Sequence, residues 1–184
     1  MSRVKMGPQE AILERVTRAQ PGIDTDHEYI HKGGFFEAHH RFTLDAAAVG
    51  RITIKTPAVK YVHYRKEHVS SSGDKVTIEL FEEPTVTAAT GTPVAAHNHN
   101  RLSAVVSGAT VLHTPTVTDD GVQISQSFIG GGTGTGQARS GAELGVGNEW
   151  VLKRDAQYLV KITNNSAAAN TVQVNLVWYE EDEG

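Results

Sequence analysis

The alternation of apolar and polar residues with a period of two constrains the fold of this chain most strongly. From residue 35 onward, short segments rich in Val, Ile, Thr and aromatic residues are separated by clusters of turn-forming residues. Nine segments are predicted to be strands: 35–44, 50–56, 60–70, 75–83, 103–113, 122–129, 149–153, 157–164 and 171–180. Because no helical segment lies between them, the pattern predicts an all-β fold, an antiparallel β-sandwich, with the jelly roll favoured among sandwiches and barrels.

The last predicted strand divides its side chains between two faces, because alternate residues of a strand point to opposite sides of a sheet. The face predicted to lie in the core carries Val172, Val174, Leu176 and Trp178, and the opposite face carries Gln173, Asn175, Val177 and Tyr179. The two preceding strands are predicted to add Trp150, Leu152, Tyr158, Val160 and Ile162 to the core.

The N-terminal part of the chain differs from the rest. Residues 1–34 are predicted to form an arm and residues 35–184 the sandwich domain. A short helix is expected over about 8–20, where Pro8 suits the first turn. A helix of this length is unstable alone in water, so we expect it to dock on its own domain or on a neighbour. Its apolar stripe consists of Ile12, Leu13 and Val16. Residues 21–34 are interpreted as a polar linker.

Composition excludes several classes of protein. The net charge of −4 argues against nucleic-acid binding driven by bulk charge. The absence of cysteine excludes a disulfide scaffold, a thiolate zinc site and a cysteine nucleophile. No apolar run approaches the roughly 20 residues that span a bilayer, and the first residues lack the apolar stretch of a secretory signal. We therefore expect a soluble protein made in the cytoplasm, with neither nucleic acid nor membrane as partner.

The string GGGTGTG at 130–136 matches the phosphate-binding signature of tubulin-like GTPases. A phosphate loop must lead into a helix, however, and here further glycines at 141, 145 and 147 would break one. A chain of 184 residues is also too short for the large α/β domain of such a GTPase. We interpret the string as a loop of the sandwich. Because glycine permits close backbone approach, three of its residues are candidate contacts with a partner: Gly131, Gly134 and Gly136.

The segment GTPVAAHNHNR at 91–101 resembles the start of the first cupin motif, which holds a metal in a β-barrel. His97 and His99 would lie on one face of a strand and could share a metal ion. The glutamate that the motif requires is replaced by Ser103 and Ala104, and no histidine follows His113. Two histidines alone make a poor catalytic centre, so we expect no metal or other cofactor. A cupin-like metalloenzyme is the least favoured alternative.

Other candidate catalytic groups are equally weak. A metal or pH-sensing cluster is conceivable from His27, His31, His39 and His40 with Asp24 and Asp26. Adjacent His39 and His40 would face opposite sides of a strand, so they could not serve one site. Glu79 and the strand-end residues Glu82 and Glu83 are expected to be solvated charges, as is the acidic tail at 179–184. No serine lies in a G-x-S-x-G turn, so no enzyme is expected.

A resemblance to a known family rests on several short motifs in order. TPTVTDDGVQI is followed by the glycine-rich loop, then by GNEWVLKRDAQYLVKITNNS and VNLVWYEE, and HVSSSGDKVTIELFEEPT lies upstream. Over roughly 36–180, this succession resembles a family of tailed-bacteriophage virion proteins that are encoded near the major capsid gene. Members placed on a virion are capsid decoration, or cement, proteins with a β-sandwich body.

The resemblance implies a structural protein that is made in the host cytoplasm and binds the capsid surface of the virion. Its expected partners are the major capsid protein and further copies of itself, as a dimer or trimer. Ile12, Leu13, Val16 and the three glycines of the loop would be its contacts. The alternative is a head-fibre base or a tail-associated module that binds a host glycan. Trp150 and Tyr179 would then stack on sugar rings, although both fit a core or subunit interface more simply.

Overall fold

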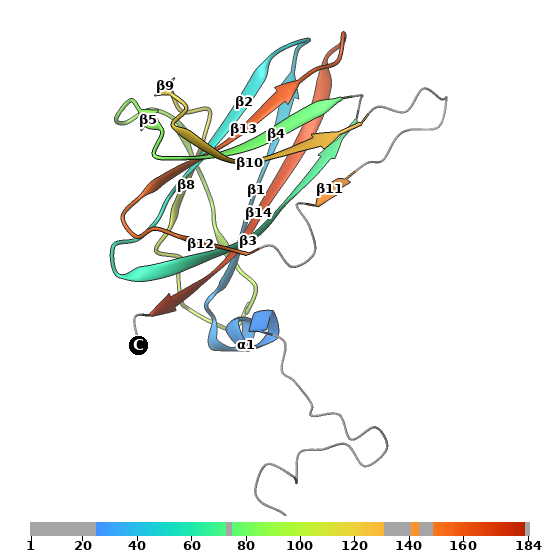
Figure 1. The fold of residues 1–184 in the computed structure, drawn as a ribbon. Coiled ribbons are helices and arrows are strands. Elements are labelled where there is room, and N and C mark those ends of the chain that lie inside the picture. The colour runs from blue at the N-terminus through green and yellow to red at the C-terminus, as the bar shows by residue number, and fades with distance from the viewer. Residues whose placement is uncertain (1–24, 73–74, 131–140, 144–148, 183–184) are drawn as a thin grey trace, which may run out of the picture.

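The computed structural model describes residues 25–72, 75–130, 141–143 and 149–182. Two antiparallel sheets pack face to face, which confirms the predicted β-sandwich (Figure 1). Sheet A contains β1 (Phe35–Leu44), β3 (Lys60–Ser71), β7 (His97–Asn98), β11 (Gly141–Glu143), β12 (Trp150–Leu152) and β14 (Asn170–Asp182). Sheet B contains β2 (Val49–Lys55), β4 (Val76–Glu82), β6 (Thr92–Val94), β8 (Thr110–His113), β10 (Val122–Ile129) and β13 (Gln157–Asn164). A third, two-stranded sheet pairs β5 (Thr85–Val86) with β9 (Val117–Asp119).

The strands pair as in a long two-stranded ribbon. β1 pairs with β14, β2 with β13, β3 with β11 and β12, and β4 with β10, all antiparallel. Two further pairings, β3 with β14 and β4 with β13, join turns of the ribbon side by side within each sheet. Sheet A has the order β11-β3-β14-β1-β7, with β12 also on β3, and sheet B the order β10-β4-β13-β2-β8-β6. Successive strands β1 to β4 therefore alternate between the two sheets.

The core lies between the sheets, and β14 shows why. The four side chains predicted to face the core are each at most 1% exposed: Val172, Val174, Leu176 and Trp178. On the opposite face, Gln173 and Asn175 remain partly exposed, as expected for the outside of a sheet. Val177 and Tyr179 on that face are buried nevertheless. They are covered by the one helix of the described residues, α1 (Thr25–Lys32).

Helix α1 lies within the segment that we interpreted as a linker, so that interpretation is wrong for residues 25–32. The helix has acidic residues in its first turn and basic residues in its last turn, which suits the helix dipole. Gly33 ends it with a φ of +74°. The N–H groups of Gly33 and Gly34 bond the carbonyls of Ile30 and Tyr29 at 3.0 and 2.9 Å. The helix predicted over 8–20 lies outside the described residues.

Two further predictions need correction. Residues 103–109 do not continue the strand predicted over 103–113, and only Thr110–His113 forms β8. Trp150 is not a core residue: it lies on the short strand β12 at the edge of sheet A and is 38% exposed. The other predicted core residues of this region are buried: Leu152, Tyr158, Val160 and Ile162. In the described part of the chain, no helix is long and apolar enough to cross a membrane.

Candidate interaction surface

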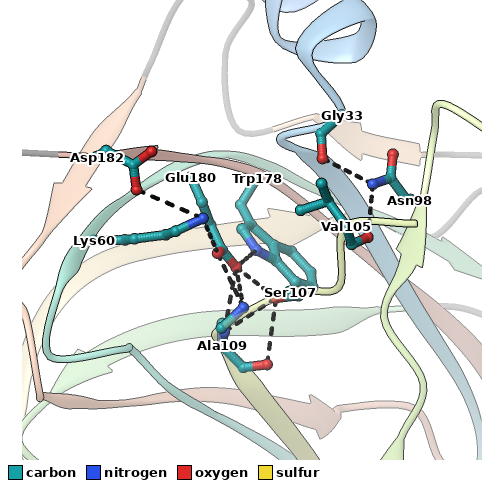
Figure 2. A network of polar contacts seen from close by, with 10 residues as sticks. Gly33, Lys60, Asn98, Val105, Ser107, Ala109, Trp178, Glu180 and Asp182 are labelled. Carbon is teal, nitrogen blue, oxygen red and sulfur yellow. Dashed lines mark hydrogen bonds and ion pairs between the residues drawn. The ribbon is translucent and has the colours of Figure 1, made fainter. Parts of the chain in front are cut away.

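A buried carboxylate fixes the segment between β7 and β8. Glu180, near the end of β14, has a fully buried side chain that accepts hydrogen bonds from four groups (Figure 2). The donors are the Ser107 hydroxyl at 2.5 Å, the Gly108 N–H at 2.9 Å, the Ala109 N–H at 3.2 Å and the Trp178 indole N–H at 3.3 Å. These bonds take up backbone N–H groups that a strand would use for its ladder. Residues 107–109 are therefore held outside the ladder, and residues 103–109 form no strand.

Lys60 adds a positive charge to this network. The Lys60 ammonium lies 3.9 Å from a Glu180 oxygen and 3.8 Å from an oxygen of the exposed Asp182 carboxylate (Figure 2). A buried charge is costly unless it is paired and hydrogen-bonded, and Glu180 has both kinds of partner. The end of β14 is thus joined to the start of β3 and to the loop before β8.

Asn98 fixes the other end of the same loop. Its amide nitrogen donates to the carbonyls of Gly33, at 2.8 Å, and Val105, at 3.0 Å (Figure 2). Its amide oxygen accepts from the Asn100 N–H at 2.8 Å. A Cβ on Gly33 would lie 2.3 Å from the Ser103 hydroxyl, so the loop packs against a residue that has to be glycine. The loop is held to the end of α1 as well as to β14.

This fixed loop presents apolar side chains to solvent. Leu102 is 98% exposed and Val106 81% exposed, and Val105 is partly exposed. The β2–β3 connection adjoins the loop, because a Cβ on Gly108 would lie 3.1 Å from Pro57, and that connection carries the exposed Val59. We define the apolar loop surface as Val59, Leu102, Val105 and Val106. Exposed apolar side chains on adjoining segments are candidates for contact with a partner.

Helix α1 docks at the same end of the sandwich (Figure 1). The Tyr29 ring stacks on the Tyr179 ring with 4.1 Å between centroids, and Ile30 packs against the same cluster. The cluster also contains the buried residues Phe35 and Val177. Helix α1 therefore packs on the body beside the apolar loop surface.

A charged network ties α1 to the sheet. Glu149 accepts a hydrogen bond from the Tyr179 hydroxyl at 2.8 Å and lies 2.5 Å from His63 Nδ1 and 2.6 Å from Arg65 Nη1. Arg65 also pairs with Asp26 of α1 at 3.0 Å. Partial burial acts to raise the pKa of the Glu149 carboxyl, but the bonds from His63, Tyr179 and Arg65 outweigh burial and hold this pKa below its usual value.

The residues predicted to make contacts or bind metal are placed as follows. His97 and His99 face the same side of sheet A, as predicted, but each has its own partner. The His97 ring stacks on His39 at 5.8 Å, and His99 Nε2 lies 3.1 Å from Glu37. Within the described ranges, no group of three or more His, Asp or Glu side chains could hold a metal ion. Seven predicted residues lie outside the described ranges: Ile12, Leu13, Val16, Asp24, Gly131, Gly134 and Gly136.

The other histidines form pairs rather than one cluster. His27 and His31 lie one turn apart on α1, with 3.1 Å between their Nε2 atoms. The His40 ring stacks on His113 at 3.8 Å, away from His39, which confirms that neighbouring histidines of β1 face opposite sides. Burial, followed by the nearby histidines, lowers the pKa of His40. No single site brings these rings together.

The remaining candidates have structural partners. Tyr179 is buried in the cluster under α1, so it is closed to a sugar ring, whereas Trp150 is partly exposed. Glu82 and Glu83 both bind Lys153, at 3.2 and 2.9 Å. The sequence predicts solvated charges at these two positions, whereas the structure pairs both carboxylates with one lysine.

The sequence interpretation missed Glu180, Glu149 and Asn98. For Glu180 a signal existed, since it continues the core-facing series of β14 two residues after Trp178. A charged residue at a core-facing position predicts a buried, hydrogen-bonded carboxylate. The prediction of a solvated acidic tail at 179–184 is therefore wrong for Glu180. Glu149 and Asn98 gave no comparable signal, because their partners are remote in sequence.

Comparison with protein-family models, with curated proteins and with solved structures finds no match to this chain.

Proposed function

We propose that this protein is a structural virion protein that binds the outside of a tailed-bacteriophage capsid and stabilises the shell, with the major capsid protein as its partner. The observation that carries the proposal is the apolar loop surface, which is held in place by Glu180 and Asn98 and lies beside α1. The sequence motifs that resemble the decoration-protein family support the same function.

The geometry suits a cement protein for two reasons. A loop that is already fixed loses little conformational entropy when it binds, so more of its contact energy stabilises the complex. Helix α1 lies at the same end, so the body and the N-terminal arm that precedes α1 in the sequence can contact neighbouring capsid subunits together. Many copies on a symmetric shell then turn weak single contacts into strong overall binding.

We also propose that the sandwich is a jelly roll. The support is the ribbon pairing of β1 with β14, β2 with β13, β3 with β12 and β4 with β10. A jelly roll is a double sheet of this kind, and viral capsid proteins commonly use it.

Binding to shells that lack the protein tests the function. The variant Leu102→Asp/Val106→Asp changes two exposed side chains that make no core contact, and we expect it to fold normally and to lose shell binding. The matched control is Ala167→Asp/Ala169→Asp, which adds the same charges to the exposed β13–β14 turn at the opposite end. Failure of the wild-type chain to bind such shells would overturn the proposal. Equal binding by both variants would show that the apolar loop surface is not the part of the protein that contacts the capsid.

A glycan-binding module remains the second candidate because of one groove. It has a volume of about 640 Å³ and lies on the outer face of sheet A beside α1. Polar side chains from α1, β1, β3, β14 and the segment after β7 line it, among them Asp26, Glu37, His99, Gln173 and Asn175. Amide and carboxylate groups above an apolar floor suit sugar hydroxyls. Binding on a glycan array, lost in Asn175→Ala and kept in the Leu102→Asp/Val106→Asp variant, would favour this candidate.

A further inference from the structure

The edges of the two sheets differ in how they are protected. An exposed edge strand can pair with another chain, and proteins blunt such edges with short strands, proline or charge. In sheet A, the edge strands β7, β11 and β12 are two or three residues long. In sheet B, the edge strand β6 has three residues, and Pro93 is the middle one. These four edges offer little or no ladder to a partner.

Strand β10, at the other edge of sheet B, is the exception. It has eight residues, VQISQSFI, and among the described strands it pairs only with β4. The strand contains no charge, no proline and no glycine, and it is rich in β-forming residues. Uncharged segments with these properties pair readily with other strands. Its one irregularity is a shift of register between Gln123 and Ser125.

We propose that β10 is a self-association edge, through which two copies of this chain pair antiparallel about a two-fold axis. The two six-stranded sheets B would then form one continuous sheet. The partner is a second copy because a two-fold axis sets the strand antiparallel to itself, and a charge near the axis would then lie close to its own copy. β10 carries no charge that would oppose this pairing, and Phe128, which is 57% exposed, would gain a cross-strand neighbour.

The same geometry limits the assembly to a dimer. Pairing through β10 uses the edge of both copies, so the contact closes on itself. The far edge of the joined sheet is β6 in each copy, where Pro93 cannot donate to a further ladder. The resemblance left dimer and trimer open, and this edge selects the dimer. The pairing involves this chain alone, so it stands or fails independently of capsid binding.

Sedimentation analysis of the full chain tests the pairing. The variant Gln123→Lys/Gln126→Lys places two charges on exposed positions of β10, and its matched control Thr92→Lys/Thr110→Lys places them on exposed positions of β6 and β8. We expect a wild-type dimer, a dissociation constant raised about tenfold or more in the β10 variant, and no change in the control. A monomeric or trimeric wild type would overturn the proposal. So would an equal rise of the dimer dissociation constant in the two variants.

A cysteine scan gives a second, independent readout, because the chain has no cysteine of its own. Cysteine is introduced singly at each position from Gln123 to Phe128, and each purified variant is oxidised. A disulfide between two copies forms only where their two Cα atoms lie within about 7 Å across the axis. We expect covalent dimers at one position or a few neighbouring positions of β10, and none from Thr92→Cys. Equal cross-linking from Thr92→Cys, or none anywhere along β10, would contradict the pairing.

Discussion

The backbone N–H of Gly108 lies 2.9 and 3.0 Å from the two carboxylate oxygens of Glu180, a residue 72 positions away in the sequence. This contact joins the end of β14 to the loop that carries the apolar loop surface. A surface formed by a loop keeps its shape only if the loop is held in place, and here a buried carboxylate holds it. The predictions below test the parts of this arrangement separately.

The substitution Glu180→Gln should destabilise the protein. The glutamine NH2 group would take the place of the oxygen that the Lys60 ammonium and the Gly108 N–H approach, and the remaining uncharged oxygen would accept more weakly from the N–H groups of Gly108 and Ala109. We expect the free energy of unfolding to fall by about 1–3 kcal/mol, measured by urea denaturation. Amide hydrogen exchange at these two residues should accelerate. The control Asp182→Asn alters an exposed carboxylate and should change little; an equal loss in both variants would contradict a specific role for Glu180.

The substitution Gly33→Ala should destabilise the junction of α1 and the loop. Gly33 has a φ of +74°, and its new Cβ would lie 2.3 Å from the Ser103 hydroxyl. The left-handed conformation alone costs about 1–2 kcal/mol in a residue other than glycine, and the displaced loop should add to the loss. Gly130→Ala is the control, because among the described residues the nearest atom to its Cβ would be a ring carbon of Phe128 at 3.9 Å. The midpoint of thermal denaturation measures the loss. If both variants unfold at the wild-type midpoint, Gly33 does not pack against the loop as described.

Removal of one aromatic ring should release α1 from the sheet. In Tyr29→Ala the stack on Tyr179 is lost, so the helix loses the centre of its contact. We expect faster hydrogen exchange at Gly33 and Gly34, whose N–H groups bond the last turn of α1. Tyr29→Phe keeps the ring and should retain most of the protection. Unchanged exchange in Tyr29→Ala would show that the stack does not hold the helix.

Acid should weaken the protein through Glu149. The pKa of this carboxyl is lower in the folded chain than its usual value of 4.5, so its ionised form stabilises the fold above that pH. This contribution should decline as the pH falls below about 4.5 and the carboxylate is protonated. In Glu149→Gln the free energy of unfolding should therefore depend less on pH in this range. Identical pH profiles for the wild type and the variant would contradict the proposed stabilisation.

The period-two pattern predicted the sandwich because burial on one face imposes it directly. Strands 35–44, 122–129 and 157–164 have the predicted bounds, and the core face of β14 is as expected. Trp150 was misplaced because its strand is short and lies at an edge, where an apolar side chain need not be buried. Periodicity indicates which residues alternate, but it does not indicate which strands lie at an edge.

The candidate surface could be predicted only in part. Helix α1 has the charge pattern of a helix, with acidic residues at its start and basic residues at its end, but it is short and has no fully buried side chain. The loop at 103–109 was predicted as a strand because its composition suits one. A hydrogen-bond partner remote in sequence, Glu180, decides otherwise, and local pattern contains no information about that partner.

Cryo-electron microscopy of the particle that carries this protein tests the central claim most directly. The account predicts density for the sandwich on the outer surface of the capsid, with the apolar loop surface and α1 turned toward the major capsid protein. Density at the tail or at fibre tips, with the groove beside α1 turned outward, would contradict the cement function and favour the glycan-binding alternative.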